Sequence, residues 1–154
     1  MSQQHLRFAL FGNEYQTKKS VAVERTINYL RAHGAELYID RPYYEFLVRQ
    51  SDDEVWCSGV FDDYNFDVDF AISLGGDGTF LRAASRVGAK GIPVLGVNMG
   101  RLGFLSDVLP LEVEKALDEI FEGQYKLEEH TVIKVEAEGE PIEGGTLRYA
   151  LVSD

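Results

Sequence analysis

The sequence is poor in cysteine, in basic residues and in long apolar runs, and each shortage excludes a class of protein. Its 154 residues include a single cysteine, Cys57, so no disulfide can form within the chain and a reducing, cytoplasmic location is expected. The 26 acidic residues outnumber the 15 basic ones, and the net charge of −11 argues against partners such as nucleic acid or an anionic membrane surface. No apolar run approaches the ~20 residues that span a bilayer, so no transmembrane helix is expected.

What the sequence does contain is a regular alternation of apolar and amphipathic segments. Apolar runs typical of buried strands occupy residues 6–11, 37–39, 68–74 and 93–97. Helical spacing of apolar residues predicts helices over 18–33, 42–49, 79–87 and 111–122, the first and last ending at Gly34 and Gly123. This alternation predicts an α/β fold with a doubly wound parallel sheet, in which ligands lie at the carboxyl ends of the strands.

Two further segments fit this pattern less simply. Residues 51–67 mix acidic and aromatic side chains and are expected to form a connecting segment packed by its aromatics. In the last predicted helix, Leu111 is expected on the apolar side together with Ala116, Leu117, Ile120 and Phe121.

The end of the chain changes to a strand pattern. Apolar and polar residues alternate over 133–138 and 147–151 around a glycine-containing turn at 139–145, which predicts a β-hairpin with one apolar face. An isolated hairpin is marginally stable in water, so this face needs a partner. We expect residues 1–125 to form an α/β nucleotide-binding domain and residues 126–154 to begin a truncated, β-rich C-terminal domain. Alternatively, the hairpin folds back on the α/β domain or pairs with another subunit.

The segment Gly75-Gly76-Asp77-Gly78-Thr79 follows a predicted strand and opens a helix. Glycines tolerate positive φ and lack Cβ, so a phosphate can approach the backbone N–H groups at the helix N-terminus. Thr79 can cap the helix or donate its hydroxyl to a phosphate oxygen. The carboxylate of Asp77 suits either a divalent metal ion that holds the phosphates or acceptance of the proton from an attacking hydroxyl. An ordinary Asp-Gly turn is the alternative.

Two better-known phosphate-binding motifs are excluded. The sequence has no Gly-x-x-x-x-Gly-Lys-Ser/Thr string, so it contains no P-loop. Counted from Gly76, the dinucleotide fingerprint of hydride-transfer enzymes would need glycine where Leu81 stands.

Two segments of the sequence together resemble the motifs of a known family. Residues 75–81 (GGDGTFL) are similar to a signature shared by NAD kinases, diacylglycerol kinases and 6-phosphofructokinases, and residues 96–105 (GVNMGRLGFL) resemble the second motif of NAD kinases. The resemblance implies phosphorylation of the 2′-hydroxyl of the adenosine ribose of NAD by ATP and a divalent metal ion such as Mg²⁺, giving NADP. It also implies a C-terminal β-rich domain and homo-oligomeric assembly.

The resemblance assigns roles to particular residues. Asp77 would activate the attacking hydroxyl, and Gly76 and Gly78 would lie against phosphates. The other nucleotide-binding positions implied are Thr79, Phe80, Leu81, Asn98, Arg101 and Phe104, with Phe104 against the adenine ring and Arg101 either on a phosphate or on the surface. No residue is assigned as a metal ligand, because the three histidines lie far apart in the sequence.

One feature departs from the family, and other functions stay open. The Asn-Glu or Asn-Asp pair that follows the hairpin in NAD kinases is replaced or missing, because the chain reads Val152-Ser153-Asp154. The alternatives are a lipid or sugar kinase of the same superfamily, and a non-catalytic nucleotide-binding or assembly fragment. The sequence distinguishes neither ATP from polyphosphate as the donor nor NAD from NADH as the acceptor.

Overall fold

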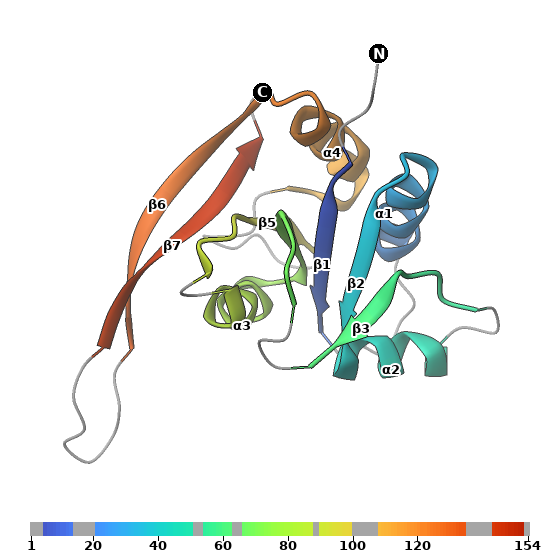
Figure 1. Ribbon diagram of the computed structural model, residues 1–154, viewed down its shortest axis with the longest axis horizontal. Helices are drawn as coiled ribbons and strands as arrows, with labels where there is room; N and C mark the ends of the chain where they lie inside the picture. The colour runs from blue at the N-terminus through green and yellow to red at the C-terminus, as the bar shows by residue number, and fades with distance from the viewer. Residues whose placement is uncertain are drawn as a thin grey trace.

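The computed structural model describes residues 5–13, 21–50, 54–62, 66–87, 90–99, 108–134 and 143–152. Its centre is a sheet of five parallel strands in the order β3-β2-β1-β4-β5 (Figure 1). The bounds are Arg7–Gly12 (β1), Glu36–Asp40 (β2), Gly59–Phe61 (β3), Phe70–Gly75 (β4) and Val94–Asn98 (β5). From β1 the chain moves to one side, through β2 to β3, and from β4 it moves to the other side, to β5. The predicted doubly wound α/β fold is confirmed, with its topological switch point between β1 and β4.

Helices cover both faces of this sheet. They are Val21–Ala32 (α1), Arg41–Gln50 (α2), Asp77–Val87 (α3) and Val113–Phe121 (α4), with a 3₁₀ turn, η2, at Pro110–Glu112. In β1, Phe8 and Leu10 point into the core shared with α1, α2 and α4, whereas Ala9 and Phe11 point into the core shared with α3. Within the described residues, no helix is long and apolar enough to cross a membrane.

The helix ends agree with the sequence in part. Gly34 and Gly123 have φ of 71° and 74°, so both predicted terminating glycines adopt the left-handed conformation that closes a helix. The start of the last helix was predicted wrongly. Leu111 lies in η2 and is 78 % exposed, and Val113 begins the buried side of α4. The short 3₁₀ turn shifts the helical phase, so the periodicity read back from Ala116 does not apply to Leu111.

The segment at 51–67 contains more than a connection. Its residues 59–61 form β3, which pairs in parallel with β2 at the edge of the sheet. The aromatic packing was predicted correctly, because Phe61 and Phe66 are buried with ring centroids 4.5 Å apart. A strand of three residues is too short for a period of two to be recognised in the sequence.

The hairpin begins earlier than predicted and continues the sheet. Strands β6 (Tyr125–Lys134) and β7 (Glu143–Val152) pair antiparallel, and β7 joins β5 in parallel through the pair Val94 and Tyr149. Gly144 and Gly145, expected in the turn, pair with Ile133 and Val132 inside the ladder. The two strands extend as a ribbon beyond the five-stranded sheet (Figure 1). The division into domains at residue 125 stays a prediction.

Candidate functional site

The two glycine-rich segments begin side by side at the carboxyl edge of the sheet. Gly75 ends β4 and lies in register with Asn98, which ends β5. The N–H of Met99 donates a hydrogen bond to the carbonyl of Gly75 over 3.0 Å. Both segments therefore start at the edge where a parallel sheet binds its ligands, as the sequence predicted. The remainder of the second segment, including Arg101 and Phe104, lies outside the described residues.

Helix α3 begins inside the first glycine-rich segment. Its first residue is Asp77, two positions earlier than predicted, and the N–H of Phe80 donates to the carbonyl of Gly76 over 3.0 Å. Gly76 thus occupies the position just outside the helix. The proposed capping role of Thr79 is wrong, because Thr79 lies within the first turn and a capping residue must precede it. Asp77 carries its negative charge at the end of the helix where the dipole favours it.

The three glycines of this turn have different reasons to be glycine. A Cβ on Gly75 would come within 2.7 Å of the Cβ of Thr79 and closer still to its hydroxyl, so packing requires glycine there. Beside Gly76 and Gly78, by contrast, no described neighbour lies within 4 Å of the position a Cβ would take. None of the three has positive φ, so their tolerance of positive φ is not used in this turn. Gly76 and Gly78 therefore leave open space at the N-terminus of α3.

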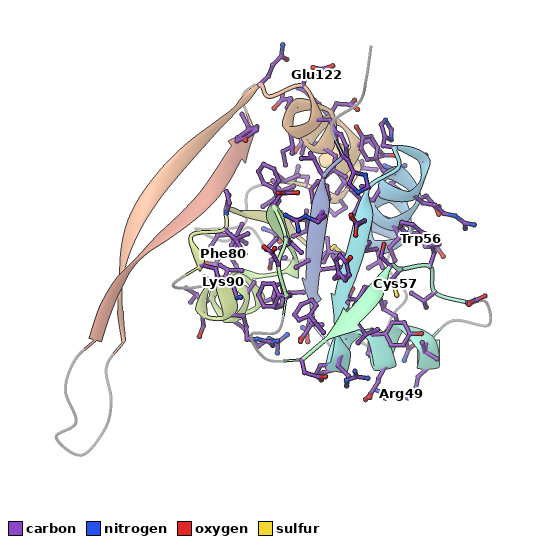
Figure 2. The ribbon with its side chains drawn as sticks, in the orientation of Figure 1. Arg49, Trp56, Cys57, Phe80, Lys90 and Glu122 are labelled. Carbon is purple, nitrogen blue, oxygen red and sulfur yellow. The ribbon has the colours of Figure 1, made fainter. Side chains whose placement is uncertain are left out.

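The other predicted nucleotide-binding residues differ strongly in exposure. Leu81 is 48 % exposed on α3 and has surface to offer a ligand. Phe80 is fully buried in the core cluster that also contains Ala83, and it packs α3 against the sheet (Figure 2). Asn98 is 2 % exposed at the end of β5, and its N–H donates to the carbonyl of Val108 over 2.7 Å. Their contacts with a nucleotide stay predictions.

The end of β1 lies next to the end of β4 at this edge of the sheet. Its contacts were not predicted from the sequence. A Cβ on Gly12 would overlap the ring of Tyr43, a fully buried residue of α2 whose pKa is raised by burial. The carbonyl of Gly12 accepts a hydrogen bond from Nη2 of Arg82 over 2.5 Å. The signal available was weak, because glycine followed by asparagine after a strand is read simply as a turn.

Asp77 is the acidic residue at the start of α3, and it can supply a carboxylate to a metal ion that phosphate oxygens also bind. Within the described ranges, no three His, Cys, Asp or Glu side chains are arranged to bind a metal ion together. Mg²⁺ is commonly held by one or two carboxylates together with phosphate oxygens and water. Asp77, at the open N-terminus of α3, is compatible with such a site.

Comparison with known proteins connects this arrangement to a family. A family model described as the ATP-NAD kinase N-terminal domain matches residues 8–125. The NAD kinase of Bacteroides fragilis is 48 % identical over 130 residues, which cover 84 % of this chain and 45 % of that protein. The NAD kinase of Porphyromonas gingivalis is 35 % identical over 145 residues, which cover 94 % and 49 %.

A solved structure has the same fold. The crystal structure of yeast NADH kinase complexed with NADH matches 95 % of this chain and 46 % of its own, with a TM-score of 0.66 and 18 % identity. At this identity the similarity concerns the fold alone. The chain spans about half the length of the curated relatives it matches.

Proposed function

Because the chain belongs to the ATP-NAD kinase family through its N-terminal domain, we propose that the protein transfers the γ-phosphoryl group of ATP to NAD. The acceptor is the 2′-hydroxyl of the adenosine ribose, and the products are NADP and ADP. The observation that carries this proposal is the N-terminus of α3, where Asp77 lies between two glycines that face open space.

In the proposed reaction, α3 binds phosphate and Asp77 takes the proton. Gly76 and Gly78 let phosphate oxygens approach the N–H groups at the N-terminus of α3. The ribose oxygen attacks the γ-phosphorus and its proton passes to the carboxylate of Asp77, while the bond between the γ-phosphorus and the bridging oxygen breaks and releases ADP. A divalent metal ion, Mg²⁺, would neutralise phosphate charge when bound.

The remaining positions have supporting roles in this proposal. Leu81 offers apolar surface to the dinucleotide, Thr79 offers its hydroxyl to a phosphate, and Asn98 holds the adjoining end of β5 beside the nucleotide. Phe80 supports the site by packing α3 against the sheet. Arg101 and Phe104 are retained from the sequence motif alone. A cytoplasmic, homo-oligomeric enzyme with a C-terminal β-rich domain completes the proposal.

The test is the substitution Asp77→Asn in the full-length protein. Removing a general base commonly costs 10²–10⁴-fold in rate, so NADP formation from NAD, ATP and Mg²⁺ should fall by about that factor. Nucleotide affinity, measured by calorimetry, should change little, since the amide has nearly the same shape. Transfer that survives Asp77→Asn at the wild-type rate would exclude the proton-acceptor role.

A matched control removes a carboxylate elsewhere. Asp67 precedes β4 at the opposite edge of the sheet, and its 87 % exposed side chain forms an ion pair with Arg7. Asp67→Asn should therefore leave NADP formation unchanged. Running both variants with NADH as the acceptor and polyphosphate as the donor would identify the preferred substrates.

A further inference from the structure

Two arginines tie α3 to strands on the far side of the switch point. The chain itself connects α3 only to β4 and β5. Arg82, however, donates from Nη2 to the carbonyl of Gly12 at the end of β1, over 2.5 Å. Four residues later, Nη1 of Arg86 bonds Oδ1 of Asp40 at the end of β2, over 3.0 Å. Residues four apart lie on the same side of a helix, so both arginines reach from α3 in one direction.

The contact made by Arg86 is buried, and two aromatic rings flank its guanidinium group. The side chains of Arg86 and Asp40 are 17 % and 7 % exposed. The guanidinium carbon lies 5.5 Å from the ring centroid of Phe11 on β1 and 5.5 Å from that of Phe61 on β3. Arg86 thus contacts the ends of β1, β2 and β3 together. A planar cation that stacks on rings while bonding a carboxylate is a role that lysine fills poorly.

Stability alone does not account for this arrangement. Apolar side chains of similar volume often replace a buried ion pair with no loss of stability, because desolvation offsets the attraction between the charges. The two polar contacts also fix the orientation of α3, because Arg82 holds it against the end of β1 and Arg86 holds it against the end of β2. Asp77 lies five residues before Arg82, about 7.5 Å along the helix axis, so the setting of α3 also sets the position of its carboxylate.

We propose that Arg82 and Arg86 are positioning residues that hold α3, and with it Asp77, in the geometry needed for phosphoryl transfer. The inference rests on the proposed kinase function. Displacing a reacting group by about 1 Å can reduce a rate 10²-fold, so loss of either contact should act on the chemical step more than on binding.

The experiment separates positioning from stability. Removing Arg86 by itself takes the cationic partner away from the buried carboxylate of Asp40 and can unfold the protein. The double variant Asp40→Asn, Arg86→Met removes both charges together and should keep a melting temperature near that of the wild type. Its kcat should fall at least about tenfold while KM stays within about threefold. A folded double variant with wild-type kcat would overturn the role of Arg86.

Arg82 is tested at little cost to the fold because its side chain is exposed. Arg82→Ala should reduce kcat at least about tenfold, and Arg82→Lys, which keeps a donor for the carbonyl of Gly12, should recover part of it. Arg49→Ala, an exposed arginine in the last turn of α2 (Figure 2), is the matched control and should leave kcat unchanged. Arg82→Ala with the kcat of the control would overturn the role of Arg82.

A second readout does not depend on activity. The hydrogen bond from Phe80 to Gly76 closes the first turn of α3, so exchange of the Phe80 amide hydrogen reports the local order of that turn. This exchange should be about tenfold faster in Arg82→Ala and in the double variant than in Arg49→Ala. If the wild-type protein forms no NADP, the proposed function is refuted, but the anchoring of α3 is still tested by the exchange measurement. In that case faster exchange supports the anchoring of α3, and unchanged exchange overturns it.

Discussion

Gly78→Ala is expected to make the protein more stable and less active. Gly78 is the second residue of α3, is exposed, lacks positive φ and has no described neighbour within 4 Å of the position that a Cβ would take. Alanine at such a helical position gains about 0.5–1 kcal/mol over glycine, largely by restricting the unfolded chain. For a chain of this size that corresponds to a melting temperature about 1–4 °C higher.

Activity should change in the opposite direction. The new methyl group would occupy the space in which a phosphate is proposed to approach the backbone of α3. We expect at least tenfold weaker ATP binding, equivalent to about 1.4 kcal/mol, and a corresponding fall in NADP formation. Calorimetric titration with ATP and a thermal melt on the same preparation measure the two effects together.

Gly75→Ala serves as the comparison, because the same substitution three residues earlier meets Thr79 at 2.7 Å or less. Overpacking of this kind costs about 1–3 kcal/mol, so this variant should melt at a lower temperature. Thr79→Ala should relieve only part of the loss, since its Cβ remains. If Gly78→Ala bound ATP as tightly as the wild type, the open space would not be the phosphate site and the role proposed for Gly76 and Gly78 would be wrong.

Three further substitutions or reactions test the fold itself. Gly34→Ala should lower the free energy of unfolding in urea by about 1–2 kcal/mol, because alanine is strained at a φ of 71°. No described neighbour lies within 4 Å of the new Cβ, so no packing contact offsets this strain. Tyr29→Phe should cost about 1–2 kcal/mol by removing the bond to Asp118. Burial and Asp118 raise the pKa of Tyr29, so this difference should be constant below pH ~10, the unfolded value, and decline as the pH rises further. Burial raises the pKa of Cys57, so iodoacetamide should alkylate it more slowly than a free cysteine at the same pH, as a timed reaction would measure.

The architecture was accessible from the sequence because the strands of a parallel sheet are buried on both faces. Continuous apolar runs such as residues 68–74 therefore identify β4 directly, and the helices between them follow from periodicity. The same reasoning missed β3, which has only three residues, and misplaced Leu111, which lies in a 3₁₀ turn before α4. Both errors occur where an element is too short to show a period.

The candidate site was accessible only in outline. The motif located Gly76, Asp77 and Gly78 at a strand-to-helix junction, which the structure has. It did not separate the glycine required by packing, Gly75, from the two that face open space, because that difference depends on how Thr79 folds over the turn. The contacts of Arg82 and Arg86 were also out of reach, since they join α3 to residues 70 and 46 positions away in the sequence.

Because of the contact between Gly12 and Tyr43, the size of the side chain at one position limits the size allowed at the other. The ring of Tyr43, in α2, already fills the space that a side chain at residue 12, at the end of β1, would take. In a library that varies residue 12 alone, we expect glycine to be the only residue recovered among folded clones. A library that varies both positions should also recover alanine or serine at residue 12, always together with a smaller side chain at residue 43.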